Sequence, residues 1–189
     1  LLNDALSEAG DDTALSGRAR LKLGELLTDQ KRWAELEAAS EPLLTLEGQP
    51  EVERARGFVL YEDAMAAQSK APEAAEAAIK ALDALPESQG ALLVAIAEIR
   101  ANRGQDEAAL AALDRLEGLT LPEEASERAM ASRARVLDRL GRAEESAAAW
   151  KRLLDATGAE TLSHQSALLA LADLDRRGGA PDKALAAMI

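Results

Sequence analysis

The chain of 189 residues contains no cysteine, a single histidine and very few aromatic residues, which make up 2% of the sequence. Without cysteine there can be no disulfide, thiolate metal site or cysteine nucleophile, and a single histidine argues against a structural zinc site. No apolar run reaches the roughly 18 residues expected of a membrane-spanning helix. We therefore expect no cofactor, no metal and no membrane insertion in this segment.

Positive charge is also in short supply. The 22 lysines and arginines are outnumbered by 34 aspartates and glutamates, which gives a net charge of −12. Nucleic-acid binding needs a basic stripe that releases counterions, so nucleic acid is excluded as a partner, and an acidic membrane surface is disfavoured for the same reason. Residues 1–95 carry −9 of this charge and residues 96–189 carry −3, so the two halves are predicted to present different surfaces.

Alanine is abundant, at about a fifth of the residues, and the strong helix formers Leu, Glu and Arg supply much of the remainder. β-Branched residues are scarce, so the composition predicts an all-α fold. Small side chains let helix axes approach closely but bury little area each. Stability must then come from many modest contacts, which favours a stack of helices over a compact globule.

Short polar or glycine-containing breaks divide the chain at regular intervals. They fall at Lys31, Lys70, Gly104, Gly141 and Gly179, with spacings of 39, 34, 37 and 38 residues. Such a period is typical of a helical repeat array.

The segment after each break carries a stripe of small or apolar residues. The stripe consists of Leu36, Ala75, Ala109, Ser146 and Ala184 five residues on, then Ser40, Ile79, Leu113, Trp150 and Met188 nine residues on, then Leu43, Leu82, Leu116 and Leu153 twelve residues on. Steps of four and three residues keep these positions on one helical face, which we expect to be buried.

Small residues recur seven positions before the breaks. They are Gly24, Ala97, Ala134 and Ala172, where two helices could cross closely. The second repeat has Asp63 at this offset and Ala64 beside it, so its register is uncertain by one residue.

These patterns predict five helix pairs. The pairs are 13–29 with 33–46, 51–68 with 72–84, 88–102 with 105–117, 122–140 with 142–157, and 160–177 with 181–189, in repeats at about 12–49, 50–87, 88–121, 122–158 and 159–189. Residues 1–10 read as the end of a preceding helix in an excerpt of a longer protein. Pro72-Glu73, Pro122-Glu123-Glu124 and Pro181-Asp182 are typical helix starts, since proline fits the first turn and the helix dipole favours acids there.

The pattern resembles the tetratricopeptide repeat family. Leu23-Gly24 matches the family's first-helix pair, Ala75, Ile79 and Pro86 match its second-helix positions, and Ser146 with Trp150 match them again in the fourth repeat. The resemblance covers the chain from about residue 12. It implies one domain, an α-α superhelix of about five bacterial-type repeats. The alternative is another α-solenoid, such as a HEAT-like one.

Several residue groups that could carry chemistry are interpreted as structural. Neighbours such as Ser163 and His164 point about 100° apart on a helix, and no third residue is evident to orient the base. The remaining groups are the helix-start pairs Glu123-Glu124 and Glu144-Glu145, the turn Arg176-Arg177-Gly178-Gly179, and the core candidates Trp33 and Trp150. We therefore expect no enzyme active site.

One group of residues predicts a surface that binds a partner. In a tetratricopeptide-like stack the first helices line the concave surface, and in the last two repeats that surface would contain the residues we call the arginine face: Arg128, Arg135, Arg139, Leu169, Arg176 and Arg177. Guanidinium forks suit an acidic peptide or a C-terminal carboxylate. The first half would supply an apolar end, from Leu21, Phe58, Leu60 or Tyr61, and Met65. In the alternative interpretation the arginines are solvated and paired with Glu127, Asp138 or Asp173 within their own helices.

The resemblance implies a scaffold or adaptor that binds a protein or peptide, in settings such as bacterial envelope assembly, secretion or polymer export. Two alternatives remain open: the accessory or regulatory region of a larger enzyme or sensor, and a periplasmic chaperone. Localisation stays open between bacterial periplasm or envelope and cytoplasm, and further repeats or a partner would cover the apolar ends of the stack.

Overall fold

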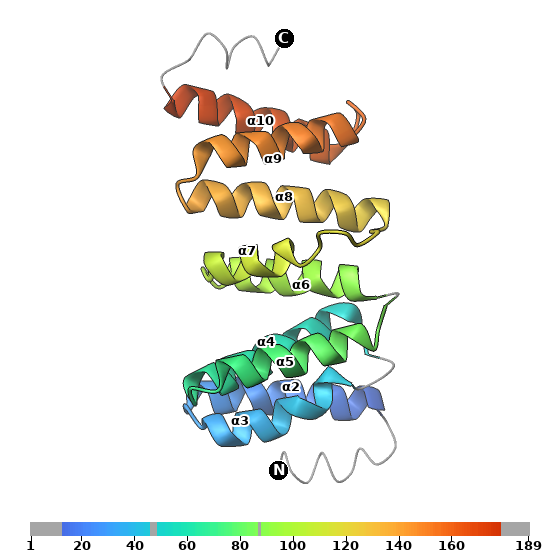
Figure 1. The fold of residues 1–189 in the computed structure, drawn as a ribbon, viewed down its shortest axis with the longest axis vertical. Helices are drawn as coiled ribbons and strands as arrows, with labels where there is room; N and C mark the ends of the chain where they lie inside the picture. The colour runs from blue at the N-terminus through green and yellow to red at the C-terminus, as the bar shows by residue number, and fades with distance from the viewer. Residues whose placement is uncertain (1–12, 46–48, 87, 179–189) are drawn as a thin grey trace. The chain divides into compact units, whose positions relative to one another are not determined.

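A computed structural model describes residues 13–45, 49–86 and 88–178, and all regular secondary structure within these ranges is helical (Figure 1). The elements are α2 (Thr13–Asp29), α3 (Trp33–Ser40), the 3-10 helix η1 (Glu41–Leu44), α4 (Glu51–Ala67), α5 (Ala71–Asp83), α6 (Gln89–Asn102), α7 (Asp106–Asp114), α8 (Glu123–Arg139), α9 (Ala143–Ala156) and α10 (Leu162–Arg177). The all-α prediction is confirmed. The helices expected at 1–10 and 181–189 lie outside the described residues.

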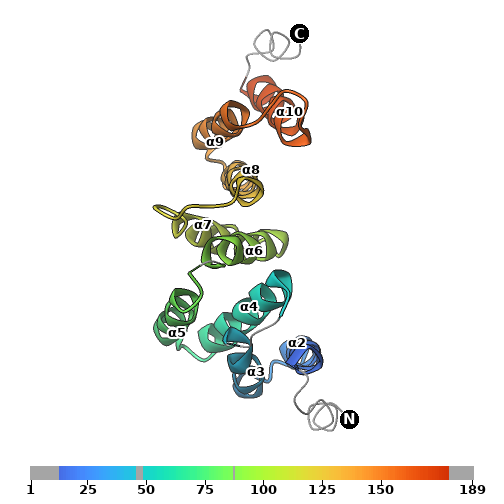
Figure 2. The ribbon, with the colours of Figure 1, turned by 90° about the vertical axis from the view of Figure 1, so that its right-hand side faces the viewer.

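The helices form two compact units, Leu1–Ile99 and Arg100–Ile189. In the first unit, α4 packs against α2, α3 and α5, and α2 packs against α3. In the second unit, α8 packs against both α7 and α9, and α9 packs against α10 (Figure 2). Each unit has its own apolar cluster, centred on residues such as Leu36 and Leu43 in the first and Trp150 and Leu153 in the second.

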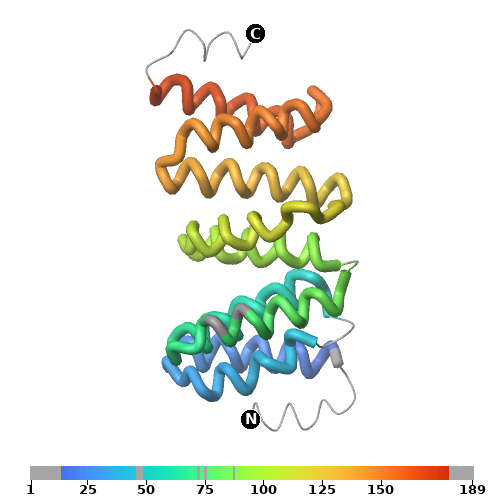
Figure 3. The backbone as a smooth tube through the Cα atoms, in the orientation of Figure 1, coloured from blue at the N-terminus to red at the C-terminus, as the bar shows by residue number. Residues whose placement is uncertain are grey.

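The same turn joins the two helices of each described hairpin (Figure 3). Its central residue has a left-handed backbone, at φ 56° in Lys31, 63° in Ser69, 72° in Gly104 and 74° in Gly141. The next residue donates its N–H to the carbonyl five positions back, and the pairs are Arg32 to Leu27, Lys70 to Met65, Gln105 to Arg100 and Arg142 to Leu137. This Schellman arrangement satisfies carbonyls that the helix end leaves without partners.

The second repeat turns one residue earlier than its sequence suggested. Its left-handed residue is Ser69 and not Lys70. The residues five and nine positions on are then Ala74 and Ala78, which are both buried. The expectation of a buried Ile79 is wrong, since 46% of this residue is exposed.

The small residues at the predicted helix crossings are buried, and a close approach is evident at Gly24. Gly24, Ala97, Ala134 and Ala172 are buried, and so is Ala64 in the second repeat. A Cβ on Gly24 would lie 2.8 Å from Leu60 Cδ1 on α4, so only glycine fits there without a shift of the neighbour.

A buried hydrogen bond joins a stripe residue to a small-residue position across the fourth hairpin. Ser146 on α9 donates its hydroxyl to the carbonyl of Ala134 on α8 at 2.8 Å. A polar residue is tolerated in this buried stripe because its hydroxyl is satisfied by the facing helix.

Two second helices end earlier than predicted. Pro42 has no N–H for an α-helical bond, so α3 stops at Ser40 and the chain continues as η1. Helix α7 stops at Asp114, and the following residues bond three positions back until Gly118, which is left-handed at φ 84°.

Other sequence expectations have mixed outcomes. Trp150 is buried and Trp33 packs against the core of the first unit, as predicted for both tryptophans. The apolar end of the expected groove is wrong: Leu21, Phe58, Leu60, Tyr61 and Met65 are all buried in the first unit. Their side chains are used for packing and leave little surface for a ligand.

The repeated turn predicts a set of stability changes. Lys31→Gly and Ser69→Gly should each raise the free energy of unfolding by about 0.5–1 kcal/mol, because glycine adopts the left-handed backbone without a Cβ penalty. Gly141→Ala should lower it by about 1 kcal/mol. Urea denaturation followed by circular dichroism measures these changes. Destabilisation by both glycine variants would contradict this account of the turn.

Candidate functional site

The arginine face lies on α8 and α10, as the sequence indicated, but much of its charge is already paired. Arg139 at the end of α8 forms a fork with Asp106 at the start of α7, with Nε 2.9 Å from Oδ1 and Nη2 also donating. Hydrogen bonding to Arg139 lowers the pKa of the Asp106 carboxyl. Arg139 therefore ties two helices of one unit together.

Arg177 makes a comparable link at the end of α10. Its Nη2 lies 2.9 Å from both carboxylate oxygens of Asp138 on α8, and its Nε lies 2.9 Å from Asp173 on its own helix. Arg176 also pairs with Asp173. Pairing with Asp173 within the same helix is the alternative that the sequence left open, and the structure shows it for both arginines. The pair between Arg177 and Asp138 joins two helices and was not expected.

The other members of the arginine face are placed differently. The guanidinium of Arg135 lies over the ring of Trp150, 5.9 Å from its centroid, and Leu169 is 62% exposed. Arg128 is half-buried and has an interaction of its own. Arg135 and Leu169 are both exposed, and Arg135 forms no ion pair among the described residues.

The first unit uses a similar link, which the sequence analysis missed. Lys70 and Gln68, at the turn after α4, both donate to the carboxylate of Glu37 on α3, at 3.0 and 2.7 Å. The hydrogen bond from Lys70 is the main cause that lowers the pKa of Glu37. The only sequence signal is charge complementarity at a separation of 33 residues.

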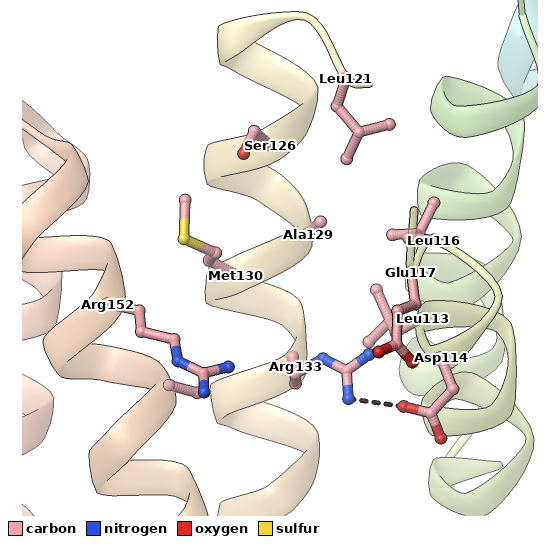
Figure 4. A pocket seen from close by; sticks show the side chains of 11 residues that line it. Leu113, Asp114, Leu116, Glu117, Leu121, Ser126, Ala129, Met130, Arg133 and Arg152 are labelled. Carbon is pink, nitrogen blue, oxygen red and sulfur yellow. Dashed lines mark hydrogen bonds and ion pairs between the residues drawn. The ribbon is translucent and has the colours of Figure 1, made fainter. Parts of the chain in front are cut away.

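A solvent-open cavity of about 380 Å³ lies in the second unit between α7, α8 and α9 (Figure 4). Its apolar lining includes the buried Leu113, Ala129 and Ala149, and Met130 lies beside them. A second hollow of about 190 Å³ shares Ala149 and three charged residues with the first. The sequence analysis missed this site, because α7, α8 and α9 each contribute only part of it.

Two arginines extend into the cavity (Figure 4). Arg133 on α8 donates to Asp114 on α7 at 2.6 Å. Arg152 reaches from α9 toward α8, and it has no hydrogen-bond or ion-pair partner among the residues that the structure describes. Its guanidinium thus keeps all its donors for an incoming anion.

Ser163 and His164 point toward different helices. The Ser163 hydroxyl donates to Glu127 on α8 at 2.7 Å, whereas His164 Nδ1 lies 3.1 Å from the carbonyl of Thr157, which follows α9. Both side chains anchor the start of α10.

Within the residues that the structure describes, no group of three or more His, Asp or Glu residues is placed to hold a metal ion. No helix in the described ranges is both long and apolar enough to cross a bilayer.

Comparison of the chain with protein-family models, curated proteins and solved structures gave no match.

The Arg139 fork predicts a pH-dependent contribution to stability. Because the folded chain lowers the pKa of Asp106 below its ordinary 3.8, the pair stabilises the fold above that pH and loses its effect as the pH falls through the lowered pKa. Asp106→Asn should lower the free energy of unfolding at pH 7 by about 1 kcal/mol, and the difference from the parent should shrink toward pH 2.

Thermal unfolding at several pH values measures this difference. Glu160→Gln is the matched control, because Glu160 is exposed and forms no ion pair among the described residues. A difference that persists unchanged to pH 2 would contradict the assignment.

Proposed function

We propose that this chain is a non-catalytic scaffold of tetratricopeptide-like repeats that binds a partner protein or peptide. The observation that carries the proposal is the recurrence of one hairpin, closed by the same left-handed turn at Lys31, Ser69, Gly104 and Gly141. Repeats of one hairpin generate extended surfaces from many similar helix faces, and such surfaces suit macromolecular partners.

The partner-binding surface in this proposal is the arginine face. Leu169 offers an exposed apolar contact, and Arg135 offers a guanidinium without a carboxylate partner among the described residues. Arg139, Arg176 and Arg177 retain fewer free donors, because acids of their own unit already occupy them. The proposed partner therefore carries an apolar group and one or two acidic residues. A long acidic tract would fit this face less well.

Site-specific photo-crosslinking tests the proposal. A benzoylphenylalanine at Leu169, in the intact protein in its own cells, should capture one predominant partner protein, because this side chain stands out from α10. Arg135→Glu should reduce the yield several-fold by opposing an acidic partner. It should lower the melting temperature only slightly, since an exposed cation-π contact contributes about 0.5–1 kcal/mol.

Ile79 is the matched control position, because it is also apolar and 46% exposed but lies on α5, a second helix. Equal crosslinking yields from positions 79 and 169 would contradict the assignment of the arginine face as the binding surface. So would a crosslinking yield that Arg135→Glu leaves unchanged.

A further inference from the structure

The two hollows of the second unit adjoin each other along α8, since Asp114, Arg133, Ala149 and Arg152 line both, and we infer that together they make one groove. Ser126, Ala129, Met130, Arg133 and Leu137 line it, at intervals that place them on a single face of this helix. The stripe covers 11 residue steps, or about 16 Å at 1.5 Å per residue. We call this surface the α8 groove.

Its walls are the two helices that pack against α8. Leu110, Leu113 and Asp114 on α7 form one wall, and Ala149 and Arg152 on α9 form the other. Each set follows the spacing of one helical face, so the groove is straight-sided and its long direction follows α8. An elongated ligand fits this shape better than a compact one.

Six charged side chains line the groove. Four of them form ion pairs, whereas Glu117 and Arg152 form none among the described residues. Arg133 is neutralised by Asp114, and Arg142 is held in a fork by Glu145 with both contacts at 2.7 Å. Arg152 lines both hollows and has no such partner among the described residues. A ligand that places one carboxylate at Arg152 and an apolar group in each hollow would complement the groove.

We propose that the α8 groove binds an amphipathic helix of a partner protein, about three turns long, with one Asp or Glu between two apolar side chains. Three turns match the length of the stripe, and an apolar helix face laid in a groove between helices is an established mode of peptide recognition. The single unpaired guanidinium favours one carboxylate over an acidic run, since Asp114, Glu117 and Glu145 would repel further negative charge. Small molecules fit less well, because both hollows are open to solvent.

A displayed library of 14-residue helices, selected against the intact chain, tests the proposal. The enriched helices should carry one fixed acid flanked by apolar residues on the same face. Arg152→Glu should weaken a selected helix about tenfold or more, and should improve binding of the same helix with Lys in place of its acid. Ala148→Trp should also weaken binding, because Ala148 is exposed and lines the smaller hollow.

Matched controls separate the groove from general charge and bulk. Lys151→Glu reverses an exposed neighbouring charge on α9, and Ala111→Trp adds the same bulk at an exposed position on α7, and neither residue lines a hollow. Both should leave affinity within about twofold. Because Arg152 and Ala148 are exposed, circular dichroism should show both groove variants as fully helical as the parent.

Three outcomes would overturn the proposal: no enrichment of helices, enriched helices without an acid, or affinity that Arg152→Glu and Ala148→Trp leave unchanged. A dimer of the chain that Arg152→Glu dissociates would also overturn it, by making a second copy the occupant. Crosslinking at Leu169 is independent of all these measurements, so failure here leaves the arginine face to be judged separately.

Discussion

The hydrogen bond that closes each hairpin is the constraint on which the rest of the structure depends. One left-handed residue lets the next N–H reach back five positions, so a helix ends and its partner begins within three residues. Such a short connection restricts the direction in which the second helix can pack back against the first. The turn residue therefore determines which side chains of α9 face α8, and it places Ser146 opposite the Ala134 carbonyl.

Scarcity of aromatic side chains shapes the packing that follows. Most buried positions hold alanine or leucine, so the helices lie close and each contact contributes little. Polar links at the helix ends supplement this core: Lys70 with Glu37 in the first unit, and Arg139 with Asp106 in the second. In the second unit, charged side chains also link neighbouring helices, as the pairs of Arg139 with Asp106 and of Arg177 with Asp138 show.

Local features of the fold could be predicted from the sequence, whereas features that depend on distant partners could not. Gly104 and Gly141 identify their turns because glycine adopts the left-handed backbone freely. Ser69 and Lys70 are both polar residues with a Cβ, so only the hydrogen-bond register distinguishes them. The same limit applies to the arginine face: Arg177 was placed correctly on its helix, but its partner Asp138 lies 39 residues away. The α8 groove needs three helices and has no signature in any one of them.

The adjacent residues Asp138 and Arg139 on α8 form ion pairs with two different helices of the second unit. Arg139 bonds back to Asp106 on α7, and Asp138 accepts from Arg177 on α10. One turn of α8 thus contributes to the interaction energy on both sides. Loosening this turn would leave Asp106 on α7 without Arg139, and Arg177 on α10 with Asp173 as its remaining partner. In the language of nearest-neighbour models, part of the coupling between neighbouring hairpins of this unit is electrostatic, so salt acts on the contacts between helices as well as on the helices themselves.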